Sequence, residues 1–185
     1  MVTTPKLVIL DRDGVINYES NAYVQSPEAW RPLPGSLRAI ALFNQLGYSV
    51  VVATNQSGIG RGYFTEATLA QIHNKMHRSL KPYHGCIDRI FYCPHRPDEH
   101  CQCRKPAPGL LKKISQHYHV ALQEQIFVGD SLCDIQVANA VNCKPYLVLT
   151  GNGQQTLAAA PWLTKTVSIF PDLLAVALKL SRTKR

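Results

Sequence analysis

The sequence lacks any long hydrophobic run. Among the first ten residues only Leu7 to Leu10 form an apolar run, and Asp11 interrupts it. Such a run is too short for the core of a signal peptide or for a membrane span. The sequence therefore predicts a cytoplasmic protein that does not associate with a membrane.

Acidic residues are scarce relative to basic ones. The chain has 12 Asp and Glu against 20 Lys and Arg, which gives a formal net charge of +8. A positive surplus favours an anionic partner, either nucleic acid or a phosphorylated metabolite. The basic residues are spread along the chain, and the one dense cluster, Arg182, Lys184 and Arg185, is typical of a solvated chain end. We therefore expect a small phosphorylated metabolite as the partner, and no nucleic acid.

The sequence also has no internal repeat, low-complexity tract or linker. A chain of 185 residues with 45% hydrophobic content is typical of one domain, here 1–185, that folds without disulfides. We expect it to be a monomer. In a reducing compartment the six cysteines are not expected to pair. Three of them lie between positions 93 and 103, as metal ligands would.

Short β-rich apolar runs alternate with longer stretches of helical period along the whole chain. The predicted strands are 6–10, 49–53, 89–92, 125–128, 145–149 and 167–170. The predicted helices are 36–46, 66–80, 109–118, 135–140 and 173–180, the second of them capped by Thr65. This alternation predicts an α/β fold with three layers, in which a Rossmann-like parallel sheet is covered on both faces.

Two segments, 17–34 and 94–108, fit neither the strand nor the helix pattern. Irregular insertions in a compact domain often carry function. We expect both to overhang the same end of the sheet. Neither is large enough to form a cap domain, so the substrate should be small or the site open.

Four polar clusters follow predicted strands or open a helix, at the edge where parallel sheets bind ligands. They are Asp11-Arg12-Asp13-Gly14, Thr54-Asn55-Gln56-Ser57-Gly58, Arg104-Lys105-Pro106 and Gly129-Asp130-Ser131-Leu132-Cys133-Asp134. The paired carboxylates of the first cluster are costly unless a cation lies between them. The hydroxyl and amides of the second can donate hydrogen bonds to an anion. Each cluster alone is more typical of a turn, a loop or a solvated pair.

Taken together and in this order, the four clusters resemble the motifs of the haloacid dehalogenase-like phosphohydrolases, over about residues 7–134. Cleavage of a phosphomonoester needs an in-line nucleophile, a proton for the leaving alkoxide and positive charge around the phosphoryl oxygens. Asp11 can supply the nucleophile and form an aspartyl-phosphate. Asp13, expected on the same side of the strand, can act as acid and then base. Lys105 would neutralise a phosphate oxygen, and Thr54 would donate a hydrogen bond.

A magnesium ion is expected at the same place. A phosphate dianion that approaches Asp11 meets like charge, and Mg²⁺ held by Asp11, the carbonyl of Asp13 and Asp130 would offset the repulsion. Asp134 is expected to orient Lys105 or the metal shell rather than to bind the metal directly.

A second metal site is predicted in the segment 94–108 and its flank. Cys93, His95, Cys101 and Cys103 offer three thiolates and an imidazole, which fit tetrahedral zinc. The alternative is a set of buried free thiols, although a loop this rich in polar residues has little core to bury them in. His100 is a rival ligand, but adjacent residues usually point apart. Four protein ligands leave no open position, so zinc should brace the loop before Arg104 and Lys105.

Within the superfamily, the stretches 11–17, 54–62 and 103–106 resemble the family of D-glycero-D-manno-heptose-1,7-bisphosphate 7-phosphatases, and less closely the histidinol-phosphate phosphatases. The resemblance extends through residue 152. It implies hydrolysis of the 7-phosphate of the heptose bisphosphate to heptose 1-phosphate, within lipopolysaccharide synthesis. It also implies a set of substrate-binding residues, namely Glu19, Ser20, Asn21, Tyr23, Asn55, Gln56, Ser57 and Arg104.

Other interpretations remain open. The chain departs from relatives in its short Cys-to-Cys loop and in Ser131, where some carry Lys. The phosphate that is not cleaved could pair with Arg61 or Arg104. The alternative activities are those of a histidinol-phosphate phosphatase and of a nucleic-acid 3'-phosphatase. The non-enzymatic alternative is a zinc-braced binding module.

Overall fold

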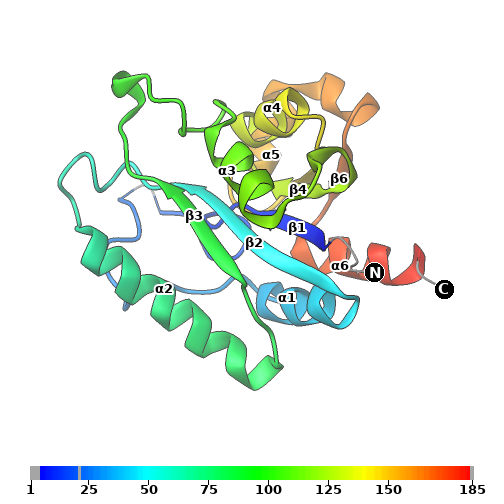
Figure 1. Ribbon diagram of the computed structural model, residues 1–185, viewed down its shortest axis with the longest axis horizontal. Coiled ribbons are helices and arrows are strands. Elements are labelled where there is room, and N and C mark those ends of the chain that lie inside the picture. Colours follow the sequence, from blue (N-terminus) through cyan, green and yellow to red (C-terminus); the bar gives the residue numbers. More distant parts are fainter. Residues whose placement is uncertain (1–4, 21, 184–185) are drawn as a thin grey trace.

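A computed structural model describes residues 5–20 and 22–183, and within them six strands form one parallel sheet (Figure 1). The strands are β1 (Lys6–Leu10), β2 (Tyr48–Asn55), β3 (Arg89–Cys93), β4 (Ile126–Gly129), β5 (Lys144–Val148) and β6 (Ser168–Phe170). Their order is β3-β2-β1-β4-β5-β6. The order reverses at β1, which makes this a doubly wound sheet with a ligand site expected at its carboxyl edge. The predicted α/β class is confirmed.

The helices cover both faces of the sheet. They are α1 (Ser36–Gln45), α2 (Glu66–Leu80), α3 (Gly109–Tyr118), α4 (Leu132–Ala140), α5 (Gly153–Ala159) and α6 (Leu173–Thr183). Short 3₁₀ turns occur at η1 (Lys81–Tyr83), η2 (Pro97–Glu99), η3 (Leu122–Glu124) and η4 (Pro161–Lys165). None of the helices in the described ranges is long and apolar enough to cross a membrane.

Differences from the expected elements lie mainly at their ends. Thr65 caps α2 as predicted, because its hydroxyl accepts a hydrogen bond from the Thr68 N–H at 3.1 Å. The fourth helix begins at Leu132 rather than at residue 135, since Ser131 and Asp134 form a capping box there. The helix α5 was not predicted, because its seven residues are mostly polar or small and show little helical period.

The strand β1 is buried on both faces, and this fixes where the first polar cluster emerges. Val8 and Leu10 face one core with α1, α2 and α6, whereas Leu7 and Ile9 face a second core with α3 and α4. The alternation follows from the two-residue period of a strand. All four side chains are fully buried. Asp11 therefore leaves the sheet at its centre.

The segment 17–34 is anchored beside the carboxyl edge of the sheet by the helix α2. The Lys75 ammonium donates hydrogen bonds to the carbonyls of Pro27 (2.7 Å) and Trp30 (2.9 Å), and it lies over the indole of the buried Trp30. Three favourable contacts on one ammonium explain why an irregular segment can hold a defined place. The other segment, 94–108, contains only the one-turn η2. In the described residues, neither insertion builds a cap.

Candidate functional site

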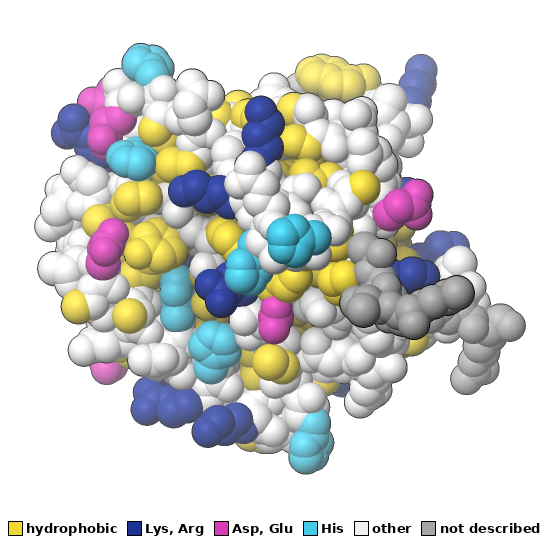
Figure 2. Space-filling view, viewed as in Figure 1, with side chains coloured by type: hydrophobic (Ala, Val, Ile, Leu, Met, Phe, Trp, Pro, Cys, Tyr) yellow, Lys and Arg dark blue, Asp and Glu magenta, His cyan; other side chains and the backbone are white. Residues whose placement is uncertain are grey.

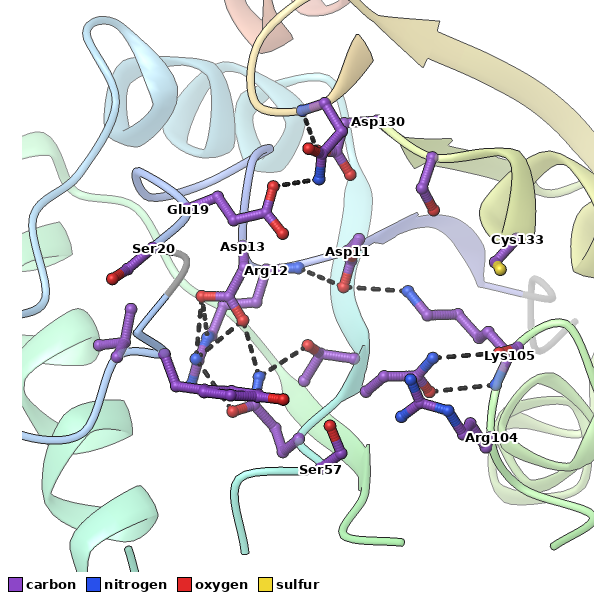
Figure 3. A pocket seen from close by; sticks show the side chains of 17 residues that line it. Asp11, Arg12, Asp13, Glu19, Ser20, Ser57, Arg104, Lys105, Asp130 and Cys133 are labelled. Atoms are coloured by element: carbon purple, nitrogen blue, oxygen red, sulfur yellow. Dashed lines mark hydrogen bonds and ion pairs between the residues drawn. The ribbon is translucent and has the colours of Figure 1, made fainter. Parts of the chain in front are cut away.

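A pocket lies at the carboxyl edge of the sheet, and both irregular segments contribute to its walls (Figure 3). The predicted site residues that line it are Asp11, Asp13, Glu19, Ser20, Tyr23, Thr54, Asn55, Gln56, Ser57, Arg104, Lys105 and Asp130. Asn21 lies outside the described residues. Arg61 is exposed and is not among the lining residues. Of the two arginines considered for a second phosphate, only Arg104 faces this pocket.

Lys105 is the central cation of the pocket. Its ammonium is 3.0 Å from a carboxylate oxygen of Asp11 and 2.6 Å from one of Asp134, and the residue is 3% exposed. Burial alone would disfavour the charged form, but the two carboxylates raise the pKa of Lys105 above its usual value. The side chain therefore stays positively charged beside Asp11.

Hydrogen bonds also fix the backbone of Lys105 and its ion-pair partner Asp134. The side chain of Asn55 accepts from the Lys105 N–H at 3.0 Å and donates to its carbonyl at 3.1 Å, which ties the end of β2 to the loop before α3. The second oxygen of Asp134 accepts from the N–H and the hydroxyl of Ser131. Both oxygens of Asp134 are therefore engaged, one by Lys105 and the other by Ser131.

Three carboxylates could hold a divalent cation. Asp11, Asp130 and Asp134 each offer an oxygen within 4.8 Å of the others. Burial, offset in part by Lys105 and reinforced by Asp134 and Asp13, raises the pKa of Asp11 to about 7. Burial and the charges of Asp11 and Asp134 raise the pKa of Asp130 to about 8. A hard cation with oxygen ligands would favour the ionised forms, and magnesium fits such a donor set. Lys105 and Ser131 engage both oxygens of Asp134, whereas the hydrogen bonds to Asp11 and to Asp130 each fall on one oxygen.

Two glycines let the backbone come close to Asp130. A Cβ on Gly14 or Gly151 would lie 2.1 or 2.2 Å from an oxygen of that carboxylate, and both glycines have positive φ. Only a residue without a side chain fits there. The same carboxylate accepts the N–H of Asn152 at 2.7 Å. Two loops that are far apart in the sequence therefore pack against the carboxylate of Asp130.

Asp13 lies beside the same pocket as Asp11, but a turn and not the alternation of a strand brings it there. Because β1 ends at Leu10, Asp13 lies in the following turn, and its carboxylate accepts hydrogen bonds from Arg12, Asn17 and Gln56. Burial alone would raise its pKa, but the Arg12 guanidinium and these hydrogen bonds lower it. Asp13 still lines the pocket.

The four predicted zinc ligands come together at the end of β3. The contacts are Cys93 Sγ to His95 Nδ1 at 3.5 Å, Cys93 to Cys101 at 3.5 Å, His95 to Cys103 at 3.2 Å, Cys101 to Cys103 at 3.5 Å and Cys103 to Cys93 at 3.1 Å. Ligands at the usual Zn–S and Zn–N distances lie about 3.5–3.8 Å apart in a tetrahedron. The contacts of this cluster are a few tenths of an ångström shorter, so the four atoms are gathered closely enough to share one zinc ion. The thiols form no disulfide. His100 is not part of the described cluster.

Sequence reasoning missed several residues of the pocket, of which Arg12 and Asn152 are the most informative. Arg12 is 1% exposed, although an arginine in a loop is usually solvated. The amide of Asn152 donates to the carboxylate of Glu19 and so joins the segment 17–34 to the loop after β5. A usable signal existed for Asn152, because it follows a strand that ends at the same edge of the sheet.

Comparisons with known proteins agree with this geometry. A family model described as HAD-hydrolase-like matches residues 102–176. A D-glycero-β-D-manno-heptose-1,7-bisphosphate 7-phosphatase from Bordetella bronchiseptica is 53% identical over 175 residues, which cover 95% of this chain and 97% of that one. The enzyme of the same name from Pseudomonas putida is 50% identical over 175 residues, which cover 95% and 99% of the two chains.

A solved structure is similar over almost the same length. The D,D-heptose 1,7-bisphosphate phosphatase of B. bronchiseptica, complexed with magnesium and phosphate, superimposes with a TM-score of 0.93 at 52% identity, covering 96% of this chain and 99% of that chain. With the fold, the pocket and these similarities together, the chain belongs to the haloacid dehalogenase-like hydrolases and, within them, to the D-glycero-β-D-manno-heptose-1,7-bisphosphate 7-phosphatase family.

Proposed function

We propose that this chain hydrolyses the 7-phosphate of D-glycero-β-D-manno-heptose 1,7-bisphosphate, with Asp11 as the nucleophile and Mg²⁺ as the cofactor. The observation that carries the proposal is the buried ion triad of Asp11, Lys105 and Asp134 at the base of the pocket. It puts a carboxylate and a fixed cation where a phosphoryl group can meet both. The names of the relatives supply the substrate.

The reaction proceeds in two displacements on phosphorus. A carboxylate oxygen of Asp11 forms a bond to phosphorus as the bond from phosphorus to the sugar oxygen breaks, and Asp13, which enters this step in its protonated form, gives its proton to that oxygen. Water then attacks the aspartyl-phosphate, Asp13 takes a proton from it, and the bond to Asp11 breaks to release phosphate. Lys105 holds negative charge on the phosphoryl oxygens, and the Thr54 hydroxyl donates to one of them.

The cation supplies charge neutralisation for the approach of the phosphate dianion to a carboxylate. Asp11 and Asp130 would hold it, together with the carbonyl of Asp13. The chain's own contribution is to keep the two carboxylates close, with Asp130 fixed by the Asn152 N–H and by close contact with Gly14.

The walls of the pocket suit the rest of a sugar bisphosphate. Arg104 faces the pocket and donates to the carbonyl of His95 at 3.4 Å, which links it to the cysteine cluster. A guanidinium in this place can pair with the phosphate that is not cleaved. On the opposite wall Glu19, Ser20 and Tyr23 offer polar atoms to sugar hydroxyls. The ring of Tyr23 contacts that of Tyr63 with centroids 5.3 Å apart.

We also propose that the four-residue cluster binds zinc and braces the loop that carries Arg104 and Lys105. The fit of the ligand spacing to a tetrahedron supports this. Because the site has four protein ligands, zinc would have a structural role only.

The alternative activities have weaker support. On the face shown in Figure 2, Lys and Arg side chains are dispersed among histidine, hydrophobic and uncharged residues rather than gathered in a basic stripe. A nucleic-acid 3'-phosphatase would need such a footprint. A non-catalytic binding module would not need the buried Asp11–Lys105 pair. We propose that the protein acts as a cytoplasmic monomer.

Substrate choice tests the proposed function directly. Phosphate release is measured with Mg²⁺ for the heptose 1,7-bisphosphate, histidinol phosphate and a 3'-phosphorylated oligonucleotide. The heptose bisphosphate should have the highest kcat/KM, because two phosphates can engage Lys105 and Arg104 together. Asp11→Asn, which keeps the shape of the side chain, should abolish release from every substrate. Equal or higher kcat/KM with histidinol phosphate would reject the proposed substrate.

Removal of the central cation gives a second prediction. Lys105→Met should lower turnover by about 10² to 10³-fold, because one charge-stabilising donor is lost from the phosphoryl site. It should also weaken inhibition by inorganic phosphate. The matched control is Lys112→Met on the exposed face of α3, which should behave as the wild type. Unchanged kinetics of Lys105→Met would show that this residue does not contact the reacting phosphate.

Metal analysis tests the zinc site. The purified protein should contain one zinc per chain, which Cys101→Ser loses and Cys86→Ser, at an exposed cysteine outside the cluster, retains. Loss of zinc should lower activity while circular dichroism still reports the folded sheet, because the metal braces one loop. Full activity in zinc-free protein would contradict the bracing role.

A further inference from the structure

The carboxylate of Asp13 is held by an unusual number of donors. One oxygen accepts from Arg12 Nε (3.2 Å), Arg12 Nη2 (2.9 Å) and Asn17 Nδ2 (2.8 Å). The other accepts from Arg12 Nη2 and Gln56 Nε2 at 2.9 and 2.8 Å. In Figure 3 these contacts join Arg12 and Asp13 on the side of the pocket away from Lys105. Multiple charge-assisted hydrogen bonds fix the position of a carboxylate in a way that one bond cannot.

Arg12 directly follows Asp11 in the sequence, but its guanidinium contacts Asp13 and Gln56. It forms an ion pair with Asp13, and its Nη2 also donates to Gln56 Oε1 at 3.1 Å. At 1% exposure the side chain has little contact with solvent. A guanidinium buried to this extent must have its donors paired, which restricts it to one orientation.

A histidine on the helix α2 contacts the remaining terminal nitrogen of the Arg12 guanidinium. Arg12 Nη1 lies 3.4 Å from His73 Nε2, on the helix α2 and 61 residues away in the sequence. Burial, together with the Arg12 charge, lowers the pKa of His73 to about 3, so the ring is neutral and Nε2 can accept. The ring packs edge-on to Tyr92 of β3. His73 therefore contacts Nη1 of the guanidinium, whereas Asp13 contacts Nε and Nη2.

We propose that Arg12 is a positioning residue for the acid and base Asp13, and that His73 fixes Arg12 in the required orientation. The inference rests on the proposed function only in that a phosphoryl group is transferred from an alcohol to Asp11. The two oxygens of Asp13 stay in place relative to the leaving oxygen because Arg12, Asn17 and Gln56 hold them. Without Arg12 the carboxylate keeps only the two amide donors, Asn17 and Gln56, and loses the charged donor that contacts both of its oxygens.

A poor leaving group needs the proton from Asp13, whereas a good one departs without it. Two substrates therefore separate the positioning role from general damage. In Arg12→Met, transfer of the phosphoryl group from a sugar phosphate should slow by about 10² to 10³-fold. Transfer from p-nitrophenyl phosphate should stay within about threefold of the wild type. Both rates are measured before the steady state, as the first turnover, so that slow hydrolysis of the aspartyl-phosphate does not mask them.

The second variant keeps the test valid if Arg12→Met fails to fold. His73→Phe keeps a ring but removes the acceptor, and should slow transfer from the sugar phosphate by about tenfold while sparing p-nitrophenyl phosphate. His73→Gln restores an acceptor and should recover most of that rate. The matched control is His77→Phe, which makes the same substitution at a half-buried histidine one turn along α2, away from the Arg12 guanidinium.

Equal slowing with both substrates would overturn the proposal, because it would mean that Asp11 or the fold had been disturbed. Unchanged rates with both substrates would overturn it as well. If the wild type hydrolyses a different sugar phosphate best, the comparison is made with that substrate. Failure of the proposed substrate and failure of the positioning role therefore give different results.

Discussion

The rest of the site depends on the ammonium of Lys105 between the carboxylates of Asp11 and Asp134. Three buried charges so close together are stable only when both signs are present and their remaining hydrogen-bonding atoms are paired. The structure meets this condition, because the Ser131 hydroxyl donates a hydrogen bond to Asp134 and the Asn55 side chain accepts one from the Lys105 N–H. The triad joins the end of β1, the loop before α3 and the first turn of α4 into one charged unit. A phosphate that enters meets a cation that is already oriented.

Two further constraints extend outward from this triad. Toward β5, Asp130 is fixed by Asn152, and Asn152 in turn contacts Glu19 on the segment 17–34. Toward the cysteine cluster, Arg104 precedes Lys105 and contacts the His95 carbonyl. The walls of the pocket are therefore tied to the same residues that organise its base. Such support from rigid elements is what a reaction requiring sub-ångström placement needs.

Much of the fold and of the pocket could be predicted from the sequence, for identifiable reasons. Alternating apolar periods place the strands, and the carboxyl edge of a parallel sheet gathers whatever polar residues follow them, which is how Asp11, Thr54 and Asp130 come together. The cysteine cluster could be predicted because its ligands are close in sequence. The buried pair of Arg12 and His73 could not, because it joins residues 61 apart and no local pattern marks it. The hydrogen bonds around Asp13 could not be predicted either, since they form in the turn that follows the end of β1 at Leu10.

The central claim is that Asp11 itself receives the phosphoryl group, and a rapid acid quench tests it most directly. Wild-type protein is mixed with heptose bisphosphate radiolabelled in the 7-phosphate, quenched within the first turnover and mapped by peptide. We predict label that is removed by hydroxylamine, as an acyl phosphate should be, on the peptide containing Asp11. The Asp11→Asn protein should carry no label. Release of labelled phosphate from the wild type with no labelled protein at any time, or label on another residue, would contradict a nucleophilic Asp11.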